Sequence, residues 1–158
     1  MKIRSYPRLI LSILLVEIIG SLGTLATSPA IPGWYASLNK PFFTPPNWLF
    51  GPVWTTLFLL MGIALYLVWQ EGLRKSNARL AVYAFSFQIA LNVLWSFLFF
   101  GLRSPILGLV EIVILWIAIL YTIIRFYRVS KPAAWLLIPY LAWVTIATFL
   151  NLGVLLLN

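Results

Sequence analysis

The chain has 158 residues, of which 63% are hydrophobic and only 9% are charged, and its formal net charge is +8. Soluble domains carry about 25% charged residues, so this composition excludes an ordinary soluble protein and indicates an integral membrane protein. A positive net charge can serve nucleic-acid binding, but that function requires basic residues on one contiguous face. Here they are dispersed over separate segments, so nucleic acid is not an expected partner.

Five apolar segments are long enough to cross a bilayer, whose hydrocarbon core of roughly 30 Å requires about 20 helical residues. In chain order they are residues 9–26, 52–70, 80–102, 106–124 and 133–157. Pro139 should kink the last of them, because proline removes a backbone hydrogen bond inside a helix. Little chain is left between the segments. Residues 1–158 are therefore expected to form a single all-α domain, an integral membrane bundle of five transmembrane helices.

The first apolar segment allows more than one interpretation. Its basic start, apolar core and small residues near Ala26 and Ser28 also fit a secretory signal peptide, but the run is long and is interrupted by Glu17. Glu17 would lie near the middle of the span, where a charged carboxylate is costly. Two roles stay open for it, a protonated and hydrogen-bonded side chain or a proton or cation site.

The connection that follows, residues 28–51, is rich in aromatic residues and proline. Because proline fixes φ and restricts the preceding residue, this connection should be semi-rigid. A belt of aromatic residues at the membrane interface would explain Trp48 alone but not the prolines. A stiff aromatic lid over the mouth of the bundle explains both, and a flat ligand would stack beneath it. The residues predicted to form this lid are Trp34, Phe42, Phe43, Pro45 and Pro46.

Polar and aromatic side chains recur at helical spacing on three of the predicted helices. They are Trp54 and Phe58 in the second, Gln88, Asn92 and Trp95 in the third, and Trp143, Ala147 and Asn151 in the fifth. Lipid would not tolerate the amides, so the stripe of the third helix must face the bundle. Each stripe could line a binding site, or it could serve hydrogen bonding between helices and core packing.

Basic residues fall in alternate connections. Nine of the eleven lie at the N-terminus and in the second and fourth connections, namely Lys2, Arg4, Arg8, Arg74, Lys75, Arg79, Arg125, Arg128 and Lys131. Lys40 and Arg103 are in the first and third. Because lysine and arginine are enriched in the cytoplasmic loops of membrane proteins, this pattern predicts a cytoplasmic N-terminus and an outside C-terminus. Membrane lipid is an expected partner of the basic loops. With no transit peptide evident, a bacterial cytoplasmic membrane is the expected location.

Conventional catalytic groups are scarce. The sequence has no histidine, no cysteine, no pair of closely spaced carboxylates and no glycine-rich phosphate loop. Hydrolytic or metal-assisted catalysis is therefore not expected, and neither a metal site nor a required cofactor is predicted. A haem would lack its usual histidine or cysteine ligand, which favours a metal-free flat ring held by stacking and hydrogen bonds.

Several stretches resemble the translocator protein family, also called the TspO/MBR family, the tryptophan-rich sensory proteins or the peripheral-type benzodiazepine receptors. "WYASLNKPFFTPP" resembles the first loop of that family, "NVLWSFLFFG" its third helix and "AWLLIPYLAWVTIATFLN" its fifth. Trp54 begins the second helix as the family's tryptophan does. The resemblance covers essentially the whole chain and indicates a bacterial-type member.

The resemblance implies a five-helix bundle that forms a homodimer, with a pocket beneath the first loop that binds porphyrins, sterols and synthetic isoquinoline or benzodiazepine ligands. It assigns the pocket to Tyr35, Trp54, Gln88, Asn92, Trp143 and Ala147. The first expectation is a receptor or carrier for protoporphyrin IX or a related tetrapyrrole, acting in tetrapyrrole or stress regulation. Two alternatives stay open: light- and oxygen-dependent degradation of porphyrin through Trp54 or Trp143, and proton-coupled export of aromatic cations through Glu17.

The sequence departs from the family pattern in two places. Phe43 stands where the family's loop often has tryptophan, which keeps the loop aromatic. The sterol-recognition pattern expected at the end of the fifth helix is missing, because no basic residue follows Lys131. Leu115, Tyr121 and Arg125 fit that loose pattern in the fourth helix. Sterol is therefore not an expected partner.

Overall fold

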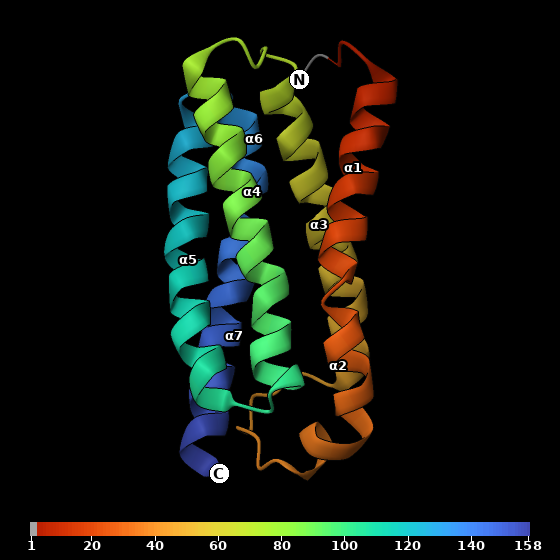
Figure 1. Ribbon diagram of the computed structural model, residues 1–158, viewed down its shortest axis with the longest axis vertical. Coiled ribbons are helices and arrows are strands. Elements are labelled where there is room, and N and C mark those ends of the chain that lie inside the picture. The colour runs from red at the N-terminus through yellow and green to blue at the C-terminus, as the bar shows by residue number, and fades with distance from the viewer. Residues whose placement is uncertain (1–2) are drawn as a thin grey trace.

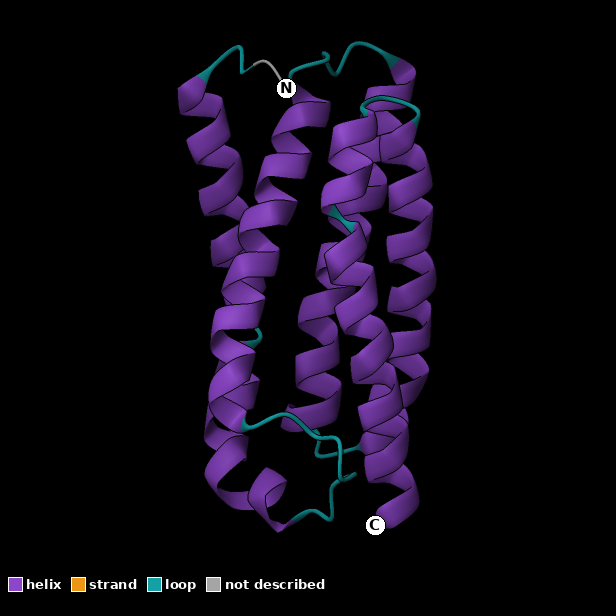
Figure 2. Ribbon diagram, turned by 180° about the vertical axis from the view of Figure 1, so that it is seen from behind, coloured by secondary structure: helices purple, strands orange, loops and turns teal. Residues whose placement is uncertain are grey.

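A computed structural model describes residues 3–158 and shows a bundle of long helices that lie side by side (Figure 1). The elements are α1 (Tyr6–Ser21), α2 (Thr24–Ala30), the π-helix η1 (Ile31–Tyr35), α3 (Asn47–Trp69), α4 (Ser76–Ser96), the π-helix η2 (Phe97–Gly101), α5 (Pro105–Tyr127), α6 (Lys131–Leu136) and α7 (Ile138–Leu157). No strand occurs in the described part of the chain (Figure 2). The predicted all-α fold class is confirmed.

Within the described residues, four helical stretches are long and apolar enough to cross a membrane, namely Asn47–Trp69, Ser76–Gly101, Pro105–Tyr127 and Lys131–Leu157. A fifth span is present if Tyr6–Ser21 and Thr24–Tyr35, which meet at a bend of 41°, count as one. The predicted break in the last span also occurs, since α6 ends at Leu136 and Pro139 lies in the first turn of α7. The architecture is therefore the predicted membrane bundle, with two of its spans interrupted.

The first connection is shorter than the predicted segment 28–51. Helical structure continues to Tyr35, and α3 begins at Asn47, so only residues 36–46 connect the two spans. Proline was a misleading signal here, because its fixed φ is compatible with a helix, and both Pro29 and Pro52 lie inside helices. Pro32 lies in the first turn of η1, and Pro52 lies near the start of α3.

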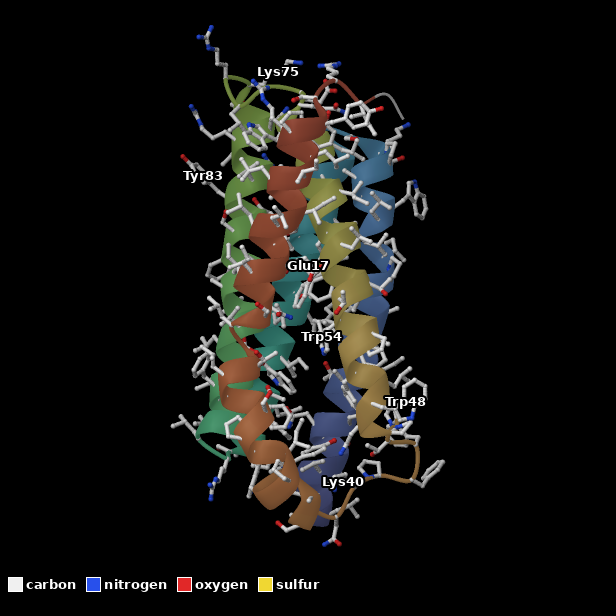
Figure 3. All side chains as sticks on the ribbon, turned by 90° about the vertical axis from the view of Figure 1, so that its right-hand side faces the viewer. Glu17, Lys40, Trp48, Trp54, Lys75 and Tyr83 are labelled. Atoms are coloured by element: carbon white, nitrogen blue, oxygen red, sulfur yellow. The ribbon has the colours of Figure 1, made fainter. Side chains whose placement is uncertain are left out.

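The two ends of the bundle differ in charge. The N-terminus and the connections 70–75 and 128–130 lie at one end, and the first and third connections and the C-terminus lie at the other (Figure 1). Lys75 and Lys40 mark these opposite ends in Figure 3. The predicted basic connections are thus together in space. Lys2, which was counted with them, lies outside the described residues.

The α1–α3 pair is held at two levels. Near the N-terminus, the hydroxyl of Tyr66 accepts hydrogen bonds from the backbone N–H groups of Arg4 at 2.8 Å and Ser5 at 2.9 Å. Deeper in the membrane, Gly62 lets the two backbones meet, because a Cβ placed there would lie 2.6 Å from the Cα of Ile13. The upper half of α1 is therefore packed directly on α3.

Replacing Gly62 with alanine should destabilise the bundle by about 1–3 kcal/mol, because the added methyl group meets backbone that cannot move without separating α1 from α3. The matched control is Gly33→Ala, where a Cβ meets no atom within 4 Å. Thermal unfolding in detergent measures both. Equal melting temperatures for Gly62→Ala and the wild type would contradict this account of the α1–α3 contact.

Candidate functional site

A cavity of about 330 Å³ lies in the half of the bundle nearer the first connection. Its walls come from both parts of the first span and from α3, α4, η2, α5 and α7. The aromatic lining residues are Tyr35, Phe50, Trp54, Phe58, Trp95, Phe100 and Trp143. In Figure 3, Glu17 and Trp54 lie one below the other between the α1–α2 ribbon and the α3 ribbon. The cavity is therefore an aromatic chamber inside the predicted membrane span.

Two aromatic contacts connect the walls contributed by α3 and α7. Phe50 meets Trp143 edge to face, with ring centroids 5.8 Å apart, and Trp54 meets Tyr140 in the same way at 6.2 Å. Trp54 also packs on Phe58 at 5.3 Å. Such pairs have preferred geometries and restrict one another's rotamers. This side of the cavity is therefore both closed and preorganised for a flat apolar ligand.

The amides on the third span have two different positions. Asn92 lines the cavity and donates a hydrogen bond from Nδ2 to the hydroxyl of Tyr140 at 3.0 Å. Gln88, one turn away from the cavity, is 1% exposed and does not line it. Neither polar atom of the Gln88 amide has a hydrogen-bond partner among the described residues. The structure therefore places Asn92, but not Gln88, where a ligand in this cavity would meet it.

A polar connection between helices borders the same chamber. The indole N–H of Trp95 donates to Oδ1 of Asn151 at 3.3 Å, and Nδ2 of Asn151 donates to the carbonyl of Pro105 at 2.7 Å. This chain joins α4, α7 and the start of α5. Asn151 therefore has the second of the two roles considered for its stripe, hydrogen bonding between helices. Trp95 takes part in the same hydrogen bonding and also lines the cavity.

The residues predicted to form a lid do not line the cavity. Phe42 is fully exposed and Phe43 is 46% exposed, and the two rings contact each other. Trp34 packs edge to face against Phe99, with centroids 5.5 Å apart. Pro45 and Pro46 are also absent from the walls. The chain that covers the chamber is instead helical and comprises Ile31, Tyr35, Asn47, Phe50 and Gly51.

The connection itself is fastened to the end of α7. The backbone N–H of Asn39 donates to Oδ1 of Asn158 at 3.0 Å, and Nδ2 of Asn158 donates to the carbonyl of Asn39 at 2.9 Å. Pro41 lies so close to Gly153 that a Cβ at that glycine would overlap its ring. The ammonium of Lys40 lies 4.8 Å from the ring centroid of Tyr35. These contacts hold the loop end of the chamber in place.

The sequence analysis named Glu17 but missed the row of polar residues on the first span to which it belongs. Glu17, Ser21, Thr24 and Ser28 all line the cavity, and they recur at i, i+4, i+7 and i+11. That spacing marks one face of a helix, so the row was a readable signal in an otherwise apolar segment. Among the lining residues of the described chain, Glu17 alone carries a charge.

The cavity offers little for conventional chemistry. The described residues contain no group of three histidine, cysteine or acidic side chains that could hold a metal ion. Glu111 is 4% exposed and does not line the chamber, although the next residue, Ile112, does. The arrangement is suited to binding an apolar ring, with the carboxyl group of Glu17 and the amides of Asn47 and Asn92 as polar groups on the walls.

Comparisons with known proteins agree with this picture. The sequence profile described as "TspO/MBR family" matches residues 12–157. The chain is 49% identical over 151 residues to the tryptophan-rich protein TspO of Archaeoglobus fulgidus, covering 96% of this chain and 97% of that one. It is 42% identical over 136 residues to the human translocator protein, covering 83% and 80%. The chain is therefore a membrane protein that belongs to the TspO/MBR family.

Proposed function

We propose that this protein is a membrane receptor or carrier that binds flat tetrapyrroles of the protoporphyrin type in the aromatic cavity. The observation that supports this most is the convergence of Trp54, Trp143, Tyr35 and Asn92 on one cavity. A flat conjugated ring gains stacking and burial from such walls, and the amide can contact a polar atom. Synthetic isoquinoline and benzodiazepine ligands have the same flat aromatic character and are proposed to compete for the site.

The size and shape of the chamber bear on the ligand. About 330 Å³ lies near the lower end of the roughly 300–1,000 Å³ typical of small-molecule sites. Preformed walls lower the entropy cost of binding, because few side chains must be ordered when the ligand arrives. The wall pairs Phe50–Trp143 and Trp54–Tyr140 are in edge-to-face contact. A rigid ring is therefore better suited to this site than a flexible chain.

The test is a titration of detergent-purified protein with protoporphyrin IX in the dark, followed by quenching of tryptophan fluorescence. We expect saturable quenching that an isoquinoline ligand reverses, which distinguishes the cavity from adsorption near any of the eight tryptophans. Illumination of the saturated complex then examines the degradation alternative, in which Trp54 or Trp143 takes part in photo-oxidation. Absence of saturable, competable quenching would overturn the proposal.

A second candidate function is supported by the position of Glu17. Its carboxylate lines the chamber in the middle of the first span, where a proton or an aromatic cation could bind it. Proton-coupled export of aromatic cations would need such a group, because the same side chain must exchange a proton for the cargo.

Replacing Glu17 with glutamine should abolish proton-driven efflux of ethidium from proteoliposomes if this second function is correct, since the amide cannot exchange a proton. Affinity for protoporphyrin should change by less than about threefold, because the aromatic walls are untouched. Glu71→Gln is the matched control, since Glu71 pairs with Arg4 at 3.4 Å near the other end of the bundle. Equal efflux by wild type and Glu17→Gln would exclude the exporter.

The proposed setting is a bacterial cytoplasmic membrane with the N-terminus in the cytoplasm and the C-terminus outside. The gathering of the basic connections at one end of the bundle supports this orientation. The chamber then lies in the outer half of the membrane. A homodimer and a role in tetrapyrrole or stress regulation are proposed from the family resemblance, and sterol is left out of the proposed ligands.

A further inference from the structure

The first span packs on α3 along only about half of the bundle. Gly20, near the end of α1, lies directly against α3, because a Cβ there would overlap the ring of Phe58. The chain then bends by 41°. Beyond the bend it approaches α4 and η2, because a Cβ at Gly23 would lie 2.6 Å from the hydroxyl of Ser96 and one at Gly101 would lie 3.6 Å from the Cβ of Ala26. The bend therefore separates α2 from α3 beside the cavity.

The residues along this separation are small, and they belong to the cavity and to the outer surface at the same time. Ser21, Thr24 and Ser28 on one edge and Gly51 and Thr55 on the other are all exposed, and all line the cavity. Residues that have both properties mark an opening rather than a wall. Figure 3 faces this side of the bundle, between the α1–α2 ribbon and α3.

The hydroxyl groups at the opening are compatible with lipid. Ser21 donates to the carbonyl of Ile18 at 2.8 Å, Thr24 donates to that of Ser21 at 2.6 Å, and Thr55 donates to that of Gly51 at 3.1 Å. Because these three hydroxyl protons are bound to carbonyl groups of the same span, exposing Ser21, Thr24 and Thr55 to the bilayer costs little. The two edges of the opening can therefore face lipid without water to satisfy their hydroxyl groups.

Other sides of the chamber are better closed. The Phe50–Trp143 contact joins α3 to α7. At the loop end, Asn39 and Asn158 exchange hydrogen bonds, and Pro41 lies against Gly153. Access through the loop would have to break these contacts, whereas α2 and α3 share no hydrogen bond and no aromatic pair in the described part of the chain.

We propose that ligands enter and leave the cavity sideways from the bilayer, between α2 and α3, across the edge formed by Ser21, Thr24, Gly51 and Thr55. This inference rests on the proposed tetrapyrrole binding. The ligand class is a flat, lipid-soluble ring that dissolves in the membrane before it binds. Such a ring can pass edge first between two helices, and the small side chains at the opening leave space for its thickness.

The test compares two neighbouring threonines. Thr55 and Thr56 are both exposed on α3, and both donate to a carbonyl four residues earlier, but only Thr55 lines the cavity. In phosphatidylcholine vesicles, Thr55→Trp should slow both the association and the dissociation of protoporphyrin IX about tenfold, while the equilibrium affinity changes much less. Thr56→Trp should keep wild-type rates. Stopped-flow porphyrin fluorescence measures both rates.

A second pair of variants gives an independent test in case Thr55→Trp does not fold. Thr24→Trp should slow both rates in the same way, whereas Leu25→Trp, at a lipid-exposed position outside the cavity, should not. Unchanged rates in Thr55→Trp and Thr24→Trp, or weaker affinity with unchanged association, would overturn sideways access while leaving porphyrin binding in place. Failure of the wild type to bind would instead overturn the proposed function, and with it this inference.

Discussion

Replacing Ala147 with tryptophan weakens protoporphyrin binding by at least about a hundredfold, a loss of about 2.7 kcal/mol. Ala147 lies on α7 one turn after Trp143, and both line the cavity. An indole at this position would fill a large part of a chamber of about 330 Å³ and would take the place of the ligand's ring. Because Ala147 lines the cavity, the new side chain extends into the space proposed for the ligand.

The matched control for this prediction is Ile146→Trp. Ile146 is the preceding residue on the same helix, is 44% exposed, and does not line the cavity. Equilibrium titration monitored by porphyrin fluorescence measures the affinity of both variants, and circular dichroism checks that both retain their helices. Wild-type affinity in Ala147→Trp would mean that the porphyrin binds elsewhere, and it would remove the cavity from the proposed function.

The sequence was a good guide to the membrane bundle. Length and hydropathy predict four of the spans, and a fifth if Tyr6–Ser21 and Thr24–Tyr35 count as one, and the interruption near Pro139 follows from the missing backbone donor. The bend after Ser21 was not predicted. The two sides of the bend pack on different helices, since Gly20 lies against Phe58 of α3 and Gly23 lies against Ser96 of α4, and such tertiary contacts are not visible in the sequence.

The candidate site was only partly predictable for the same reason. Helical spacing placed Gln88 and Asn92 on one face, but it could not show where along that face the cavity ends, and the end falls between them. The proline-rich segment suggested a stiff lid. Pro41 in this segment packs closely against Gly153. The residues that cover the cavity, Tyr35 and Phe50, come instead from the helices on either side.

The second large effect is expected at Trp143, which contributes an aromatic wall and holds Phe50 in position. Trp143→Ala should weaken protoporphyrin binding by roughly ten- to a hundredfold, because the ligand loses one stacking surface and Phe50 loses its edge-to-face partner at 5.8 Å. Trp143→Phe keeps a ring for both contacts and should lose less. Trp135→Ala is the control, since Trp135 lies in the same span but is 66% exposed and outside the cavity.

The three variants at Trp143 and Trp135 should be compared by porphyrin absorbance, because removing a tryptophan changes the protein's own fluorescence. The order of affinity expected is Trp135→Ala equal to wild type, then Trp143→Phe, then Trp143→Ala. Equal losses in Trp143→Phe and Trp143→Ala would contradict a stacking role, since phenylalanine keeps an aromatic face that alanine lacks. That outcome would move the proposed position of the ring toward Trp54 and Asn92.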